Sequence, residues 1–548
     1  MRHLWSIAML SLVLCACQHH QTNGGNDRSE TSDLPSPGYT FSPGIVGDDI
    51  AQHMKALSSD ALLGRTIGGN AEQRTTHYLI QQFERIGLQP GNQGGWLQKV
   101  PYVAATLQHA GQTQLTIEGG DTPASLTFGK DMVVGTLDEQ EHSSLASSPL
   151  VFVGYGIDAP GEHWNDYTGT DLKGKTVIIL VNDPGWASQD PSFFRGREYT
   201  YFGRWTYKFE EAAREGAAAA FIVHDTDAAG YPWEVVQNSW SRPRLDLPKV
   251  AGDPRRLPVA GWLTTEAARQ LFAHAGVDFD ALKRQAGQRG FTAVPLNATL
   301  SVAFDSTITH GESHNVVAML NGTKRADEAV VYSAHWDHVA DNDAAPRGTV
   351  DNASGVAGLL EIAEAFAHRA PKPHRSILFI ATTMDENGLL GSRYYVANPV
   401  VPLARTVADI NLDMLPVDGP ASALAVIGFG QSQLDDYLAD AAHSQRRKVT
   451  PDIAPEKGFF FRSDQLSFAR AGVPVLYARS AATQPDAAPT GGDTAGPSDA
   501  FDERWNLSGM VEDVRALFMV GSRLSMEDTY PQWKPGSDYR RPESMQGL

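Results

Sequence analysis

The sequence predicts an α/β fold built on a mostly parallel sheet with helices on both faces. From residue 313 onward, short apolar runs alternate regularly with amphipathic helical segments, a pattern typical of parallel strands joined by helices. Between residues 130 and 290 the sequence pattern changes to short runs of β-forming residues that end in Gly, Asn or Asp. The chain has 548 residues, which is longer than one core usually supports. We therefore expect two or more domains.

The C-terminal alternation predicts each element in turn. Strands are expected at residues 315–320, 329–334, 376–383, 407–414 and 473–478, and helices at 353–368, 388–398, 431–445 and 508–524. Two further helices are expected between residues 45 and 90, where apolar residues recur at helical spacing and the second series ends before Gly87. In sheets of this kind, ligands bind at the carboxyl ends of the strands.

The middle segment contains the strand-like runs SPLVFVGYGI, LKGKTVIILVND and GAAAAFIVHD, with a helical stretch, YKFEEAAREG, between the last two. These runs resemble a protease-associated domain, a noncatalytic module often inserted into exported peptidases. An ordinary α/β insert would show the same alternation. We predict an insert at 130–290, with the surrounding peptidase-like domain formed by 45–129 and 291–548.

The N-terminus reads as an export signal. Its apolar run, LWSIAMLSLVL, is too short to span a bilayer as a mature helix. The run ends in LCAC, which resembles a bacterial lipoprotein cleavage box with Cys17 as the acylated first residue; a plain secretory signal is the alternative. We predict a signal peptide at 1–17, a polar flexible linker at 18–44, and a protein anchored by lipid in the bacterial cell envelope, facing the periplasm. Both cysteines lie in this box, so the mature fold has no internal disulfide.

The charge balance limits the possible partners. The chain has 45 Lys and Arg against 64 Asp and Glu, a formal net charge of −19, and no Lys/Arg-rich block. This composition disfavours binding to a phosphate backbone, and we expect no nucleic-acid partner.

Polar residues follow several of the predicted strands. Each one alone is more often a cap or a hydrogen-bonded structural group, but their recurrence at one edge of a sheet predicts a common site. The adjacent Asp385 and Glu386 would repel each other unless a cation or a proton lies between them. Imidazole with several carboxylates suits zinc, and two ions that share a carboxylate are common in hydrolytic sites. The candidates are His335, Asp337, His338, Asp351, Asp385, Glu386 and Asp413.

The motifs HWDH, VDNASG, DENGLLGS and NLDM, in this order and spacing, resemble the bacterial aminopeptidase branch of the dizinc exopeptidases related to glutamate carboxypeptidase II. The resemblance covers about residues 50–125 and 310–525. It implies that His335 and Asp413 bind one zinc ion, with Asp351 as the bridging ligand. Glu386 would bind the other ion.

The same resemblance assigns two further roles. Asp337 would orient His335 as a supporting carboxylate. Asp385 falls where the family has its general base, which takes a proton from the attacking water.

The sequence departs from the family pattern at three positions. The base is normally Glu, and Asp385 is shorter by roughly 1–1.5 Å, a misplacement that can reduce a rate on the order of a hundredfold. The last zinc-binding histidine of the family aligns with Ala495, and a second family histidine aligns with Gln465. Asp493 is a possible substitute ligand. We therefore expect one firmly bound zinc, with the second site weak or empty.

Two functional interpretations follow. The first is an exported zinc aminopeptidase that acts on a peptide with a free N-terminus. The alternative is a catalytically impaired or noncatalytic binding protein that retains the peptidase fold and a partial metal site. A serine hydrolase is disfavoured because the sequence has no G-x-S-x-G elbow.

Overall fold

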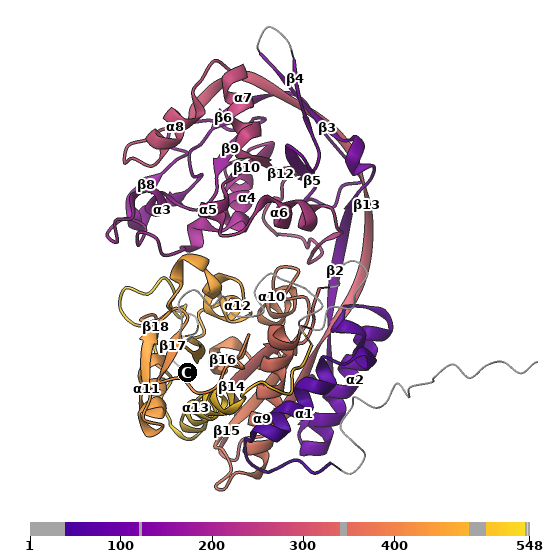
Figure 1. Ribbon diagram of the computed structural model, residues 1–548, viewed down its shortest axis with the longest axis vertical. Helices are drawn as coiled ribbons and strands as arrows, with labels where there is room; N and C mark the ends of the chain where they lie inside the picture. Colours follow the sequence, from indigo (N-terminus) through magenta and orange to yellow (C-terminus); the bar gives the residue numbers. More distant parts are fainter. Residues whose placement is uncertain (1–38, 120–122, 340–347, 482–499, 543–544, 546–548) are drawn as a thin grey trace, which may run out of the picture.

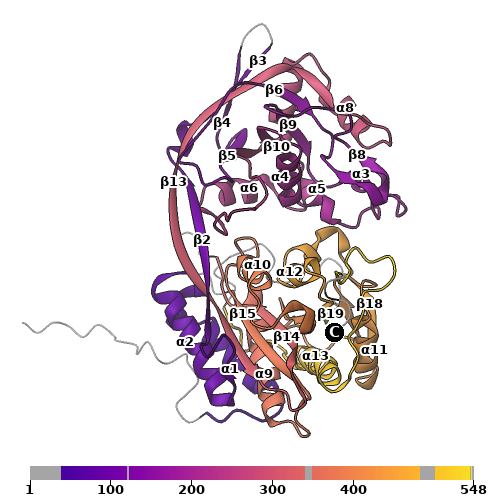
Figure 2. The same cartoon turned by 180° about the vertical axis from the view of Figure 1, so that it is seen from behind.

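The computed structural model describes residues 39–119, 123–339, 348–481, 500–542 and 545. The chain forms two lobes joined by the long curved strand β13 (Val294–Leu320), which runs along one side of both lobes (Figures 1 and 2). The first part of β13 pairs with the sheet of the upper lobe, and the second part pairs with the sheet of the lower lobe. Strand β2 (Leu97–Leu107) pairs antiparallel with residues 306–316 of β13, so the connection between lobes is a two-stranded ribbon.

The lower lobe contains the predicted mostly parallel sheet. Its strands lie in the order β13, β15, β14, β16, β19; the last four are parallel, and β13 is antiparallel to β15. Strand β17 pairs antiparallel with β19 and parallel with β18, which extends the sheet beyond the predicted strands. The remaining bounds are β14 (Arg325–His335), β15 (Arg375–Thr382), β16 (Thr406–Asn411), β17 (Ala423–Val426), β18 (Lys448–Pro451), β19 (Val475–Ser480) and the short β1 (Gln89–Pro90).

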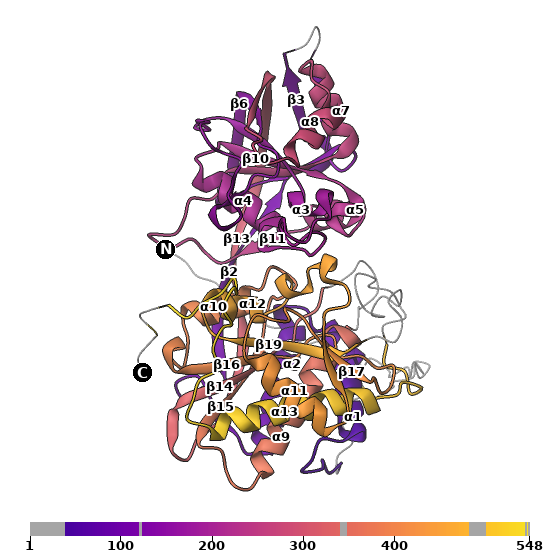
Figure 3. The ribbon, with the colours of Figure 1, turned by 90° about the vertical axis from the view of Figure 1, so that its left-hand side faces the viewer.

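Helices cover both faces of this sheet, as predicted. On β14, Val330 and Tyr332 belong to the core under α1, α2, α9 and α13, whereas Val331 belongs to the core under α10 and α12. Figure 3 shows α10 and α12 on the side of the lower lobe nearest the upper lobe. The helices are α1 (Gly47–Leu57), α2 (Gly69–Ile86), α9 (Gly355–His368), α10 (Leu390–Ala397), α11 (Leu434–Ser444), α12 (Gln465–Arg470) and α13 (Ser508–Met526). Of these, only α12 has no counterpart among the helices expected from the sequence.

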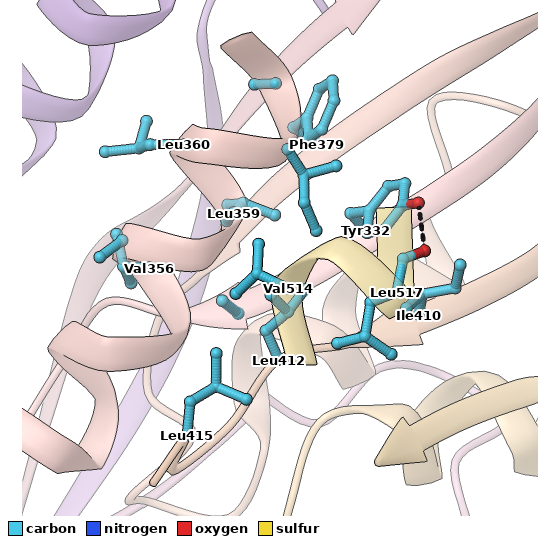
Figure 4. Close-up of a cluster of buried hydrophobic side chains, with 14 of the residues drawn as sticks. Tyr332, Val356, Leu359, Leu360, Phe379, Ile410, Leu412, Leu415, Val514 and Leu517 are labelled. Atoms are coloured by element: carbon cyan, nitrogen blue, oxygen red, sulfur yellow. Dashed lines mark hydrogen bonds between the residues drawn. The ribbon is translucent and has the colours of Figure 1, made fainter. Parts of the chain in front are cut away.

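The core between the sheet, α9 and α13 is tightly packed (Figure 4). The Tyr332 ring stacks on Phe379 with the ring centroids 5.7 Å apart, and its hydroxyl donates to the Leu517 carbonyl of α13 at 2.9 Å. A buried tyrosine is stable when its hydroxyl has such a partner. Each large aliphatic side chain buried here, such as Leu359 or Val514, contributes about 1.5–3 kcal/mol. The strands that carry the candidate residues are therefore held on a rigid support.

The upper lobe has its own sheet and its own cores. Strands β6, β9, β10 and β12 are parallel in this order, and β5 is antiparallel to β12. Strands β3 and β6 pair with the first part of β13, and β4 pairs with β3. The strands are β3 (Gln114–Glu118), β4 (Ala124–Thr127), β5 (Met132–Gly135), β6 (His142–Phe152), β7 (Asp158–Ala159), β8 (Trp164–Asn165), β9 (Thr176–Leu180), β10 (Ala219–His224), β11 (Arg244–Asp246) and β12 (Val259–Thr264). The helices are α3 (Pro184–Ser188), α4 (Trp205–Arg214), α5 (Thr226–Ala229), α6 (Trp233–Trp240), α7 (Thr265–His274) and α8 (Phe279–Ala286).

The upper sheet extends past both predicted limits of the insert. Strands β3 and β4 precede residue 130, and residues 294–305 of β13 follow residue 290. The chain passes between the lobes within the β2 and β13 ribbon, and neither strand is interrupted at the crossing. The assignment of this lobe as a protease-associated domain stays a prediction. In the described parts of the chain, no helix combines the length and apolarity needed to cross a membrane.

Candidate metal centre

The strand order of the lower sheet brings the candidate residues to one place. His335 is the last residue of β14, the strand between β15 and β16. Strand β15 leads into Asp385 and Glu386, and β16 leads into Asp413. Asp351 lies in the irregular turn that begins α9. Because β14, β15 and β16 are parallel, their carboxyl ends meet at the same edge, as the sequence predicted.

Three of the predicted ligands form a compact group. His335 Nε2 lies 3.1 Å from Asp351 Oδ1 and 3.4 Å from Asp413 Oδ1. Ligand atoms of these three residues all lie within 4.8 Å of one another. Two ligands of one tetrahedral zinc ion, at bond lengths of about 2.0–2.1 Å, are about 3.3 Å apart. The spacing of this triad therefore fits a zinc ion.

The hydrogen bonds of the site also fit a cation. Asp413 Oδ1 and Asp385 Oδ1 are both buried, and neither has a hydrogen-bond partner among the described residues. Although Asp413 Oδ1 is near the His335 ring, the geometry between them is not that of a hydrogen bond. Buried carboxylate oxygens are nearly always hydrogen-bonded, so unpartnered ones on two residues that both lie near His335 Nε2 indicate that something else binds there.

The pKa values of the residues around the triad also indicate a site for a positive charge. Burial acts to lower the pKa of His335, but Asp385, Asp351 and Asp413 overcome this effect and raise that pKa well above its ordinary value. Burial raises the pKa of Asp385 far above the usual range for a carboxyl group. Several carboxyl groups thus surround His335 in a largely buried site, where a positive charge is stabilised.

His335 is oriented by Asp337, but not in the predicted way. The ring atom His335 Nδ1 lies 3.1 Å from the backbone carbonyl oxygen of Asp337, whereas the nearest carboxylate oxygen is 3.8 Å away. The carboxylate instead accepts a hydrogen bond from the Asp385 backbone N–H at 3.1 Å. Burial raises the pKa of Asp337 to about 7. Since a carbonyl oxygen can only accept, Nδ1 of His335 carries the proton and Nε2 is left for a metal.

Glu386 lies beside His338 and not within the compact triad. Glu386 Oε1 is 3.0 Å from His338 Nδ1, and the Glu386 side chain is 22% exposed. The sequence analysis named His338 only as one of several candidates. The sequence feature that marked His338 is its place as the second histidine of the HWDH motif.

The positions where the sequence departs from the family have different outcomes. Gln465 is fully buried, and its amide donates to the Phe460 carbonyl at 2.8 Å and accepts from Asn411 at 2.8 Å. Its polar atoms are therefore occupied by structural hydrogen bonds. Ala495, Asp493 and Cys17 lie outside the described residues.

Two supporting residues were missed by the sequence analysis. Arg65 is buried and donates to the carbonyls of Trp336 at 2.9 Å and Gly348 at 2.7 Å, which ties together the two loops that carry the site. Asp464 is fully buried beside the site and accepts a hydrogen bond from the Thr382 hydroxyl. Arg65 stands in no periodic pattern and at no strand end, so no sequence signal marked it. Asp464 directly precedes Gln465, a position that the sequence did single out, but no role was assigned to the aspartate.

Comparisons with known proteins find a matching family model and a similar fold. Residues 315–508 match the model of Peptidase family M28. The fold is similar to the aminopeptidase from Aneurinibacillus sp. strain AM-1, with a TM-score of 0.52 at 20% identity, covering 91% of this chain and 98% of that one.

Two curated relatives are also similar in sequence. A probable glutamate carboxypeptidase of Arabidopsis thaliana is 24% identical over 364 residues, 62% of this chain and 47% of the relative. Probable leucine aminopeptidase 2 of Aspergillus fumigatus is 29% identical over 243 residues, 41% of this chain and 46% of the relative. The chain thus spans about half the length of these relatives. The match of residues 315–508 to the Peptidase family M28 model confirms the predicted resemblance to the zinc exopeptidases.

Proposed function

We propose that the protein is a zinc-dependent aminopeptidase that removes the N-terminal residue from peptides. The observation that carries this proposal is the meeting of His335, Asp351 and Asp413 beside the buried Asp385, with two carboxylate oxygens that have no partner among the described residues. The aminopeptidases among the similar proteins support the same chemistry.

His335, Asp351 and Asp413 would hold the zinc ion. A zinc ion in such a site polarises the peptide carbonyl and makes water more acidic. Asp385 accepts the proton from water at its unpartnered Oδ1 as the oxygen bonds to the carbonyl carbon. It then gives this proton to the leaving nitrogen as the carbon–nitrogen bond breaks.

The residues of the site also determine how Asp385 is positioned. Its backbone N–H is held by the Asp337 carboxylate at 3.1 Å, and its Oδ2 lies 3.9 Å from His335 Nε2. The preceding residue, Met384, has a φ of 54°, a left-handed conformation that is rare for this residue type. This turn directly precedes Asp385, whose side chain reaches the site although it is shorter than Glu.

We expect the His335 site to bind zinc firmly and the region around Glu386 to bind it more weakly. Two of the three ligands at the His335 site are nearly fully buried, since His335, Asp413 and Asp351 are 2%, 7% and 23% exposed, whereas Glu386 is 22% exposed. A buried, preorganised ligand set is held in place by its packing and loses less freedom on binding. The excess of carboxylates would attract the free ammonium group of a substrate.

The direct test compares peptides with free and acetylated N-termini. The full mature chain, loaded with zinc, is expected to release the first residue only from the free peptide, to lose activity with a chelator and to regain it with zinc. Equal cleavage of both peptides would contradict an aminopeptidase. Zinc-loaded protein that cleaves neither peptide would favour the noncatalytic binding protein, which the shortened Asp385 also favours.

We also propose that the protein is exported and anchored by a lipid on Cys17, on the basis of the LCAC sequence at residues 14–17. The variant Cys17→Ser should lose acylation and remain an uncleaved precursor. If the wild type and the variant both yield mature protein of the same size without lipid, the anchor is wrong.

A further inference from the structure

We propose that His338 is a metal ligand, and that His338 and Glu386 hold a second metal ion beside the His335 triad. This inference rests on the proposed zinc site and extends it. It assigns the histidine of the second position to a residue only three places after His335, in the same loop.

The loop that carries His338 is fixed by backbone contacts. The His338 backbone N–H donates to the Arg65 carbonyl at 3.2 Å, and Arg65 in turn donates to the Gly348 carbonyl at 2.7 Å. A Cβ atom on Gly348 would lie 2.6 Å from Cγ of the His338 ring and 2.4 Å from the Asp351 carbonyl oxygen. The imidazole therefore lies directly against the turn that leads to Asp351, and only glycine fits between them.

The two ring nitrogens of His338 are used unequally. Nδ1 lies 3.0 Å from Glu386 Oε1, whereas Nε2 is buried and has no hydrogen-bond partner in the described parts of the chain. The side chain as a whole is 9% exposed. A histidine buried to support the fold normally uses both nitrogens. Among the described residues, only one nitrogen of the His338 ring has a partner, and that partner is Glu386, a predicted metal ligand.

The spacing of the pair is that of two ligands of one ion. Two ligands of a tetrahedral zinc ion are about 3.3 Å apart. His338 Nδ1 and Glu386 Oε1 are 3.0 Å apart. This is close to the distances of 3.1 and 3.4 Å from His335 Nε2 to the carboxylate oxygens of Asp351 and Asp413. Asp351, a member of the adjacent His335 triad, follows the turn against which the His338 ring lies.

Another histidine–carboxylate pair in the lower lobe shows the difference. His314 Nδ1 lies 2.7 Å from Glu72 Oε1, but Glu72 also accepts from the Gly68 backbone N–H at 2.6 Å. That glutamate is therefore a structural acceptor that helps to hold the start of α2. No such second role is shown by the described contacts of Glu386.

The test is a count of bound metal. The full mature chain is loaded with zinc, dialysed against graded concentrations of chelator and analysed for zinc per chain. We expect two ions in the wild type, the second lost at the lower chelator concentration, and one ion in His338→Ala. Cobalt in place of zinc provides a second readout, since the visible absorption of the second position should be absent in the variant.

Two further variants separate a ligand from a positioning residue. In His338→Gln the amide can still donate to Glu386 but is a poor zinc ligand. Loss of the second ion in both His338 variants is expected; a second ion retained by His338→Gln or by His338→Ala would overturn the proposal. The matched control is His142→Ala, which breaks a pair of 2.8 Å with Asp305 in the upper lobe and should keep both ions.

The zinc count and the activity assay test the second metal position and the proposed function separately. Two ions in the wild type and one in His338→Ala, without turnover of any peptide, would support this inference and contradict the proposed function. An active wild type that never holds more than one ion would overturn the inference alone. Retention of the first ion by His338→Ala shows that the variant is folded.

Discussion

Each lobe has a histidine at the carboxyl end of a parallel strand, and the two residues have opposite surroundings. His224 ends β10 in the upper lobe; its Nε2 is 3.0 Å from the Tyr231 carbonyl oxygen, and its ring is close to Trp233 and Trp262. Burial lowers the pKa of His224. His335 ends β14 in the lower lobe, where carboxylates raise its pKa despite burial. Both histidines thus end a parallel strand of their sheet, and the difference in pKa comes from the residues that surround them.

The acidic residues at the strand ends differ in the same way. In the upper lobe, Asp183 caps α3 by accepting from the Gly185 N–H at 2.9 Å and also accepts from the Thr200 hydroxyl. Asp225 caps α5 and pairs with Lys283 at 2.6 Å. Their oxygens are used to hold the fold. A strand-end carboxylate thus indicates a functional site only when its oxygens lack structural partners, as in the lower lobe.

The largest expected contrast is in activity. Asp385→Asn should reduce the turnover of aminoacyl substrates by about 10²–10⁴-fold, because the amide cannot take a proton, while zinc content stays the same. Asp225→Asn in the upper lobe should leave the turnover number unchanged. The measurement is steady-state kinetics with zinc analysis of each variant. An active Asp385→Asn would show that another group is the base.

The next contrast concerns how Asp337 acts. Its carboxylate holds the Asp385 backbone, and Asn could accept the same hydrogen bond, so Asp337→Asn should stay within about tenfold of the wild type. Asp337→Ala should lose roughly 10–100-fold in activity or metal affinity. Equal losses in both variants would show that the negative charge of Asp337 matters, as the sequence analysis expected.

A smaller effect is expected from a structural carboxylate of the upper lobe. Asp183→Ala removes the cap of α3 and should lower the free energy of unfolding by roughly 0.5–2 kcal/mol, with no change in the turnover number. Urea unfolding followed by tryptophan fluorescence, together with kinetics, tests both parts. A loss of turnover in a folded variant would contradict the division of roles between the lobes.

The smallest effect is a pH dependence of stability from His224. Because its pKa is lower in the folded state than the ordinary value near 6.5, the unfolded chain binds the extra proton first as the pH falls. The stability that neutral His224 provides is therefore present above about pH 6.5 and lost below it. The stability difference between wild type and His224→Phe should shrink from pH 7.5 to pH 5. A difference that is constant or grows would contradict the assigned pKa direction.

Local patterns in the sequence were sufficient for the elements of the lower lobe. The run at 329–334 predicted the core of β14, and the helical spacing at 353–368 predicted α9 within two residues at its start. The rule that parallel strands present their carboxyl ends at one edge, with the quoted motifs, brought His335, Asp351 and Asp413 together in prediction. Periodicity and turn residues are local properties, so they can be read without knowledge of the fold.

Contacts between distant segments were decided only by the tertiary structure. The sequence analysis missed the 27-residue length of β13 because a strand that crosses from one lobe to the other needs no turn residues. It assigned Asp337 by its carboxylate, whereas the backbone carbonyl contacts His335 at 3.1 Å. It left His338 as one candidate among several, and strand pairing places it 3.0 Å from Glu386, 48 positions away in the chain. Residue types and spacing determine which chemical groups are available, but the register of paired strands and the packing of the loops determine which atoms meet.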